Sequence, residues 1–323
     1  MQKESQITGA HEGKQATLEI NEEVLSKQTE NSGMETSRRD LMKTIAGATA
    51  FGVATSTVAA WGAEPLKGRI KQSVAAWCYS GYMKKNNISM EQFIASCAEI
   101  GVKGVEMIGE ENWPLLKKHN MVCPMISTHS IGKGLNRAEN HDAALDSLRK
   151  FIDKAATWGY PNVITFSGNC GGLDKQQGLE QCVVALKKIA PYAEEKKVTI
   201  CLEYLNSISH KDYMADTTAW CAELINRVNS PRVKVLYDIY HAAMMKENPL
   251  TDIQKHASCW GHYHTGGMPG RAEIDPGLQT LDYVAIAKAI ADSGYTGFLG
   301  QEFTPKNADA LQSLRNAVKL CDV

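Results

Sequence analysis

From about residue 70 onward, short apolar runs alternate with longer amphipathic segments. The short runs are rich in β-branched and other apolar residues, a composition typical of strands in a buried parallel sheet. Strands are expected at 72–79, 102–108, 121–128, 162–166, 198–204, 233–237, 259–264 and 297–303.

The longer segments repeat apolar residues at three- and four-residue spacing, as a helix with one buried face does. In the segment 90–100, the residues on one such face are Phe93, Ile94, Cys97 and Ile100. Further helices are expected at 142–158, 179–196, 217–228, 281–293 and 308–320. Several strands follow a glycine that is typical of a helix end, namely Gly101, Gly159 and Gly294.

Eight strand–helix units within roughly 250 residues, without hairpin signals, match the size and rhythm of a (β/α)₈ barrel. The sequence therefore predicts an α/β protein with a single TIM barrel domain over residues 64–323. A doubly wound open sheet would carry a glycine-rich phosphate loop after its first strand, and Trp-Cys-Tyr-Ser-Gly at 77–81 is not such a loop.

The first 63 residues have a different character. Residues 1–33 are polar and are expected to be disordered. The pair Arg38-Arg39 precedes a weakly apolar stretch of small residues, and together they resemble a twin-arginine export signal. An arginine pair placed by chance before an amphipathic helix is the alternative. The resemblance implies passage through the twin-arginine machinery, cleavage near residue 63 and a periplasmic or otherwise exported protein; Met34 would make a natural start.

Composition narrows the classes of partner. With a formal net charge of -1, the chain lacks the basic excess that nucleic-acid binding requires. No apolar run in the expected barrel is long enough to cross a membrane, so no stable span is expected after processing. Nine cysteines without a C-x-x-C pair indicate buried free thiols rather than a disulfide framework. A homo-oligomer is compatible with the sequence.

Four consecutive expected strands end in an acidic or imidazole side chain. TIM barrels carry their active sites at the C-terminal ends of their strands, so these side chains should converge. Such a group would be repulsive or unsatisfied without a cation, and its donors favour Mn²⁺ or Mg²⁺, with Co²⁺ or Zn²⁺ as alternatives. The expected ligands of this single divalent ion are Glu203, Asp238, His264 and Glu302.

The region 198–305 resembles the hydroxypyruvate isomerase and sugar epimerase group of xylose-isomerase-like barrels. The resemblance rests on Leu-Glu-Tyr-Leu-Asn at 202–206, Asp-Ile-Tyr-His at 238–241, Gly-His-Tyr-His at 261–264, Pro-Gly-Arg-x-Glu at 269–273, Gly-Tyr-x-Gly at 294–297 and Gln-Glu-Phe-x-Pro at 301–305. It implies that the four expected ligands hold the metal and that Glu203 and Glu302 act as an acid/base pair. It also implies that His241 and Arg271 contact substrate oxygens.

The activity implied is isomerisation of a small sugar or hydroxy-keto acid by proton transfer through an enediolate. Two alternatives use the same site: a ketose 3-epimerase, and an exported lyase that cleaves 3-keto-glycosides by β-elimination. A carbohydrate-binding protein without catalysis is disfavoured by the intact glutamate pair, and a multi-zinc endonuclease by the neutral charge. At His264 the sequence departs from the hydroxypyruvate isomerases, which carry glutamine there, and agrees with the epimerases.

Some of these residues have structural alternatives. His241 could cap the following helix, and Arg271 could pair with Glu273 or Asp275. Asn206 is expected to support the Glu203 loop or to serve as a turn residue.

Further residues near the expected site are less distinctive. Glu106 is expected either beside a metal ligand or in a salt bridge at the barrel rim. His129 follows the third expected strand and is expected either to line the pocket or to lie outside it. Trp77 and Tyr79 either form an apolar wall or fill the barrel. His262 is expected to point away from the barrel axis, opposite His264, and is not counted as a ligand.

Overall fold

A computed structural model describes residues 66–323 of the chain. The expected leader and export signal at 1–63 lie outside the described residues. Within the described part, no helix is both long and apolar enough to cross a membrane.

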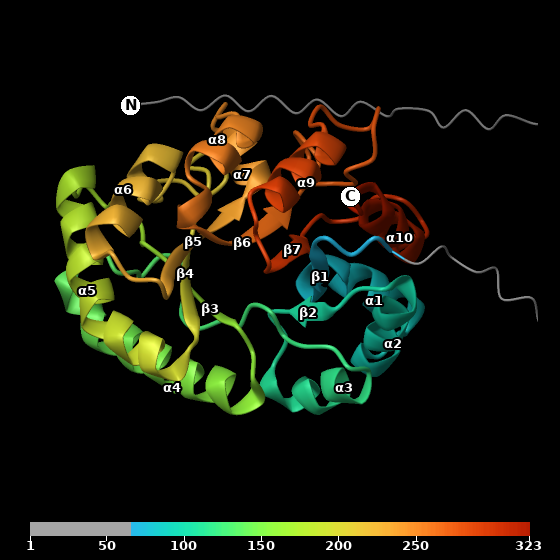
Figure 1. Ribbon diagram of the computed structural model, residues 1–323, viewed down its shortest axis with the longest axis horizontal. Helices are drawn as coiled ribbons and strands as arrows, with labels where there is room; N and C mark the ends of the chain where they lie inside the picture. The colour runs from blue at the N-terminus through green and yellow to red at the C-terminus, as the bar shows by residue number, and fades with distance from the viewer. Residues whose placement is uncertain (1–65) are drawn as a thin grey trace, which may run out of the picture. The chain divides into compact units, whose positions relative to one another are not determined.

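Seven parallel strands form one curled sheet, and the helices surround it as an outer ring (Figure 1). This arrangement is the predicted α/β TIM barrel fold. The sheet order is β2-β1-β7-β6-β5-β4-β3, so strands from both ends of the described chain lie side by side. The strands are β1 (Lys71–Ala75), β2 (Gly104–Glu106), β3 (Asn162–Thr165), β4 (Thr199–Glu203), β5 (Val233–Asp238), β6 (Trp260–Thr265) and β7 (Phe298–Gln301).

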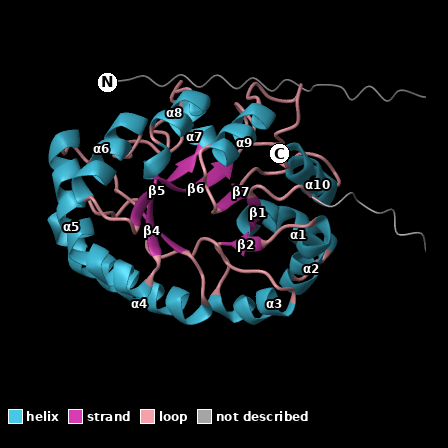
Figure 2. Cartoon of the chain, viewed as in Figure 1, coloured by secondary structure: helices cyan, strands magenta, loops and turns pink. Residues whose placement is uncertain are grey.

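The expected third strand at 121–128 is not a continuous strand, and Figure 2 draws the chain between α3 and α4 without a strand arrow. Only isolated parallel bridges join this segment to its neighbours, Val122 to Gly104 of β2 and Ile126 to Val163 of β3. Pro124 lies between the two bridges and has no N–H group to donate, which explains why the ladder breaks there. The segment nevertheless takes the eighth position and closes the barrel.

The expected helices are present, with boundaries that shift by a few residues. The described α-helices are α1 (Ser80–Asn86), α2 (Met90–Ile100), α3 (Trp113–Lys118), α4 (His141–Trp158), α5 (Lys175–Lys196), α6 (Thr218–Val228), α7 (Ile239–Met244), α8 (Pro249–Lys255), α9 (Tyr283–Asp292) and α10 (Ala310–Leu320). Helix α2 begins with a capping box between Ser89 and Gln92 and ends at Gly101, whose φ of 100° is left-handed. Short helices such as α7 and α8 carry too little periodicity to be predicted.

The first strand also ends earlier than expected. It stops at Ala75, and residues 76–79 form a 3₁₀ helix, η1 (Ala76–Tyr79). This turn directs the chain over the end of the barrel, so Trp77 lies at the rim instead of inside a strand. Tyr79, which was expected in the wall or the barrel filling, is buried and packs against Phe93 and Phe303.

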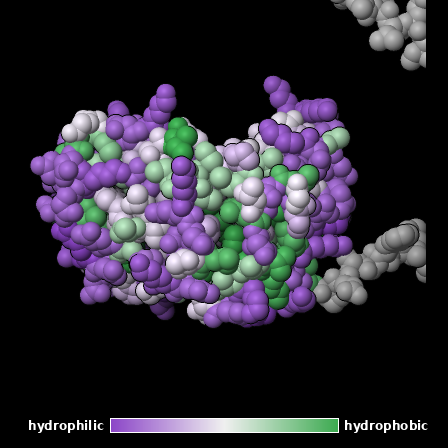
Figure 3. All heavy atoms as spheres, turned by 90° about the horizontal axis from the view of Figure 1, so that it is seen from above, coloured by the Kyte–Doolittle hydropathy of each residue, from purple (hydrophilic) through white to green (hydrophobic). Residues whose placement is uncertain are grey.

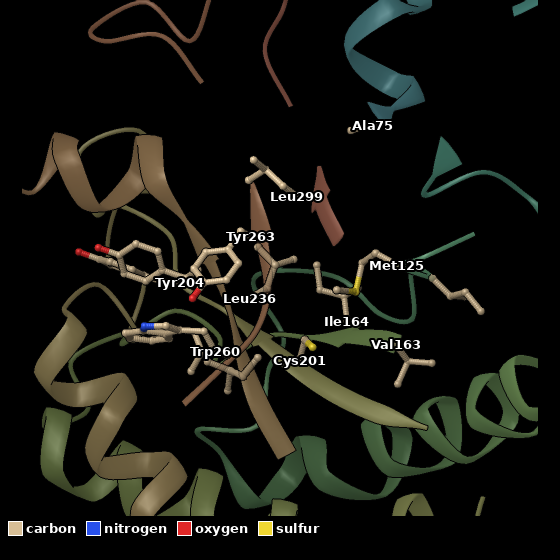
Figure 4. Packing of buried hydrophobic residues seen from close by; sticks show 14 of the residues in the cluster. Ala75, Met125, Val163, Ile164, Cys201, Tyr204, Leu236, Trp260, Tyr263 and Leu299 are labelled. Carbon is tan, nitrogen blue, oxygen red and sulfur yellow. The ribbon is translucent and has the colours of Figure 1, made fainter. Parts of the chain in front are cut away.

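Apolar side chains fill the space between the strands and the helices. Figure 4 shows part of this core, including Leu236, Tyr263 and Leu299 from three neighbouring strands, all fully buried. Burying a side chain of this size stabilises the fold by about 1.5–3 kcal/mol. The face drawn in Figure 3 is mainly hydrophilic, with apolar atoms gathered in a limited area.

Candidate metal-binding active site

Four strand-end side chains converge at the C-terminal end of the barrel. Glu203 and Asp238 are the last residues of β4 and β5, His264 lies near the end of β6, and Glu302 directly follows β7. Each offers one ligand atom to a cluster in which all such atoms lie within 4.8 Å of one another. All four residues are buried, so the structure brings together the complete ligand set that the sequence suggested.

The cluster concentrates negative charge in a place shielded from water. His264 Nδ1 lies 2.7 Å from Glu302 Oε2 and 4.0 Å from Glu203 Oε1. The Arg271 guanidinium contacts both Asp238 Oδ2, at 2.8 Å, and Glu302 Oε2. Three carboxylates thus share one guanidinium and one imidazole. Their oxygen and nitrogen donors fit a divalent cation of the hard to borderline kind.

The two glutamates have different electrostatic surroundings. Burial, reinforced by the nearby Glu302 carboxylate, raises the pKa of Glu203 to about 8. Burial also opposes the charge of Glu302, but His264 and Arg271 outweigh it and hold the pKa of Glu302 well below its usual range. Two neighbouring carboxyl groups whose pKa values are pushed apart are suited to act as acid and base.

A further acidic residue lies beneath the cluster. Glu106, at the end of β2, is fully buried and accepts hydrogen bonds from His264 Nε2 at 2.9 Å and His262 Nε2 at 3.0 Å. The expectation that Glu106 forms a salt bridge at the barrel rim is therefore wrong. Glu106 lies inside the barrel, beside the candidate metal ligand His264. The expected direction of His262 is also wrong: residues two apart on a strand project to the same face, so His262 points inward with His264.

His241 lies in α7 beside the cluster. The helix is capped by Asp238, whose Oδ1 accepts a hydrogen bond from the His241 backbone N–H at 3.1 Å. The cap uses only the backbone of His241, and its fully buried imidazole lies with Nε2 3.7 Å from Asp238 Oδ2, outside the residues that line the cavity described below. Its Nδ1 accepts from the Asn206 backbone N–H at 3.2 Å, while Nε2 is buried without a hydrogen-bond partner. Asn206 thereby holds the imidazole of His241, and it also forms a turn by accepting from the backbone N–H of Ser209 at 2.7 Å.

Arg271 pairs with the cluster and not with Glu273 or Asp275. Its guanidinium lies between aromatic rings, 5.4 Å from the centroid of Trp77 and 5.3 Å from that of Tyr240. The backbone of Arg271 has a φ of 51°, in the left-handed region that few non-glycine residues adopt. This turn directs the side chain back toward the ends of β5 and β7.

A cavity of about 540 Å³ opens beside the cluster. Its lining combines the titratable side chains Glu203, Glu302, Arg271, His129 and His210 with apolar ones such as Ile164 and Phe166. The lining residues are Trp77, Met107, Ser127, His129, Ser130, Ile131, Ile164, Phe166, Glu203, Leu205, His210, Arg271 and Glu302. His210, which sequence reasoning missed, sits in a loop with no strand-end signal, whereas Trp77 and His129 were expected candidates.

Comparison with known proteins agrees with this architecture. Residues 94–320 match the family described as xylose isomerase-like TIM barrel. The chain therefore belongs to this family.

Curated relatives of the chain are isomerases and epimerases. A D-psicose 3-epimerase of Ruminiclostridium cellulolyticum is 30% identical over 130 residues, which are 40% of this chain and 43% of the epimerase. The chain thus spans less than half of the length of that epimerase. A putative hydroxypyruvate isomerase of Mus musculus is 27% identical over 189 residues, 56% of this chain and 67% of the relative.

Solved structures share the fold. The AP endonuclease of family 2 from Brucella melitensis superposes with a TM-score of 0.67 at 21% identity, covering 76% of this chain and 97% of that one. The IOLI protein, solved with a bound zinc atom, superposes with a TM-score of 0.60 at 14% identity, covering 78% and 95%. At these identities the likeness concerns the fold alone.

Proposed function

We propose that this protein is a metal-dependent isomerase or epimerase that acts on a small sugar or hydroxy-keto acid. One observation carries the proposal: Glu203 and Glu302, from strands on different sides of β5 and β6, meet with Asp238 and His264 in one buried cluster beside a cavity. The isomerase and epimerase relatives support the reaction class.

Glu203, Asp238, His264 and Glu302 would hold the divalent ion, with Mn²⁺ or Mg²⁺ favoured by the three carboxylates and Co²⁺ or Zn²⁺ as alternatives. When bound, the ion supplies Lewis acidity that polarises a substrate carbonyl and acidifies the neighbouring C–H. The bound zinc in the IOLI structure is consistent with a divalent ion in a barrel of this fold.

The glutamate pair moves the proton. An ionised glutamate removes a proton from the carbon beside the substrate carbonyl, which gives an enediolate. A protonated glutamate then returns a proton to the opposite face of the same carbon, for epimerisation, or to the former carbonyl carbon, for isomerisation, in which case the hydroxyl proton also passes to the former carbonyl oxygen. Without a cation, burial raises the pKa of Glu203, while His264 and Arg271 hold that of Glu302 low, so Glu302 is the more readily ionised of the two carboxyl groups.

Two further residues orient the substrate. The Nε2 of His241 is buried without a hydrogen-bond partner and lies 3.7 Å from Asp238 Oδ2; because Nδ1 accepts from Asn206, Nε2 is the nitrogen that carries the proton. Burial, together with the positive charge of Arg271, lowers the pKa of His241, so a neutral N–H donor is available to a substrate oxygen. Arg271, held over the cluster, supplies a fixed positive charge for the enediolate oxygens.

The substrate can be found with one panel in D₂O. The metal-loaded protein is incubated with hydroxypyruvate, several ketoses and 3-keto-glucosides, and the products are followed by NMR. Deuterium at the carbon beside the carbonyl, with no group released, supports isomerisation or epimerisation. Release of the aglycone from a 3-keto-glucoside would instead favour the lyase, and no conversion by a metal-loaded, folded protein would contradict the proposal.

We also propose that the chain is exported by the twin-arginine route, on the strength of Arg38-Arg39 and the small-residue stretch that follows. N-terminal sequencing of the protein recovered from cells tests this. A mature end near residue 64 is expected, and retention of the arginine pair in a protein confined to the cytoplasm would contradict it.

A further inference from the structure

Glu106 reaches across the inside of the barrel to a candidate metal ligand on a distant strand. It lies on β2, and His264 lies on β6, with β1 and β7 between them in the sheet. The carboxylate accepts hydrogen bonds from His264 Nε2 at 2.9 Å, from His262 Nε2 at 3.0 Å and from the Ser73 hydroxyl. Its side chain is completely shielded from solvent.

The two intervening strands leave room for this reach. Ser73 of β1 and His264 of β6 both pair in register with Gly300 of β7, so the three residues form one row across the sheet. A Cβ atom on Gly300 would lie 2.7 Å from Glu106 Oε1 and 2.7 Å from His264 Cδ2. Any side chain at position 300 would therefore force the carboxylate, the imidazole or both to shift.

The hydrogen bond decides which nitrogen of His264 faces the cluster. Because Nε2 donates a hydrogen bond to Glu106, Nδ1 is the nitrogen directed at Glu203 and Glu302. Nδ1 makes no well-directed hydrogen bond of its own, although it lies 2.7 Å from Glu302 Oε2. A carboxylate on the far nitrogen of a metal-binding histidine fixes the ring and makes the near nitrogen a better ligand.

We propose that Glu106 is a positioning residue that holds the His264 ring with Nδ1 toward the cation and thereby sets the affinity of the site for metal. The inference rests on the proposed function for the presence of the cation, and extends it to a residue that contacts no substrate. His262 and Ser73 act through Glu106: their hydrogen bonds hold its carboxylate in place, so it cannot rotate away from His264.

The test measures metal affinity directly. Mn²⁺, and in parallel Zn²⁺, is titrated into metal-free protein by isothermal calorimetry. Loss of a carboxylate of this kind typically weakens metal binding about 10- to 100-fold. Glu106→Gln keeps one acceptor oxygen but loses the charge, so its affinity for the metal should fall about 10-fold. Glu106→Ala also releases the imidazole, so its affinity should fall about 100-fold.

A second variant disturbs the same contact without removing any polar group. Gly300→Ala should also weaken Mn²⁺ binding, because the added methyl group displaces Glu106 or His264 and so disturbs the hydrogen bond between them. Gly81→Ala is the matched control: a Cβ there meets nothing within 4 Å, and binding should not change. Glu194→Gln serves as a control for general loss of stability, since Glu194 accepts a hydrogen bond from the Ser230 hydroxyl at 2.6 Å, just before β5 begins and at the other end of that strand from Asp238.

The outcomes separate the two proposals. If the folded wild-type protein binds neither ion, the proposed function fails. If the wild type binds but the Glu106 variants and Gly300→Ala bind within about twofold of it, the role of Glu106 is wrong while the proposed function stands. If the Glu106 variants do not fold, Gly300→Ala alone decides.

Discussion

The indole Nε1 of Trp77 donates a hydrogen bond to Glu302 Oε1 at 2.8 Å, although Trp77 is 45% exposed. A residue at the rim of the cavity thus orients one member of the proposed acid/base pair. The indole can reach Glu302 because β1 ends early, at Ala75, and η1 then carries Trp77 over the end of the barrel.

We expect Trp77→Phe to lower kcat about 10-fold with little change in KM. A hydrogen bond to a charged group is worth about 1.5–3 kcal/mol when buried, and here water can replace part of it. Steady-state kinetics on the substrate found by the D₂O panel provide the measurement. An unchanged kcat would mean that the bond plays no part in orienting Glu302.

His241 and Asn206 should behave as a pair. Replacing His241 by alanine removes the proposed donor to substrate and should raise KM at least 10-fold. Asn206→Ala leaves the imidazole in place but removes the side chain that approaches its Nδ1, and we expect a smaller rise, about threefold. If the two effects simply added in the double variant, Asn206 would be acting independently of His241.

Glu273 is expected to stabilise the fold instead of taking part in the reaction. Its Oε1 accepts from the backbone N–H groups of Lys306 and Asn307, at 2.8 and 2.9 Å, and from the Ser313 hydroxyl at 3.0 Å. Glu273→Gln should lower the free energy of unfolding by about 1–3 kcal/mol at pH 7, because the amide satisfies these donors less well. Urea denaturation measures this.

The effect of Glu273 should depend on pH in one direction. Burial opposes its charge, but the hydrogen bonds outweigh burial and lower the pKa of Glu273 in the folded protein. A group with a depressed folded pKa stabilises the fold above its unfolded pKa and loses that contribution as the pH falls toward the folded value. The difference between wild type and Glu273→Gln should therefore shrink below about pH 4.5. A difference that grows on acidification would contradict this account.

The sequence predicted the parts of the site that follow a strong local pattern. Glu203, Asp238 and Glu302 each end an apolar run, and in a parallel barrel such positions must meet. Glu106 also ends an apolar run, but its hydrogen bond to His264 forms only because the small residues Ser73 and Gly300 lie between them. That arrangement depends on the register of neighbouring strands. No local pattern reports such a relationship.

Other features depended on geometry that periodicity does not capture. The segment 121–128 is apolar enough for a strand, yet Pro124 interrupts its hydrogen bonds. The apolar run of β1 continues through the 3₁₀ turn that places Trp77 at the rim. The sequence pattern therefore does not show where the strand ends. His262 was misplaced for a simpler reason, since residues two apart on a strand share a face.

The nine cysteines should react unequally. Eight are buried and Cys170 is partly exposed; none forms a disulfide. Burial raises the pKa of the thiols, as at Cys97 and Cys182, so few thiolates form. A thiol reagent at pH 8 should label about one cysteine per native chain and nine in urea. Cys170→Ser should abolish the native reaction; rapid labelling of several thiols would contradict the packing described.

The turnover of Glu203→Gln and Glu302→Gln shows whether these two glutamates move the substrate proton. Both variants are saturated with metal, with metal content and fold verified, and compared with Glu91→Gln, an exposed control. We expect kcat to fall by a factor on the order of 10²–10⁴ in each glutamine variant and to stay unchanged in the control. Turnover within a few-fold of wild type in either metal-loaded variant would contradict this role of the two glutamates.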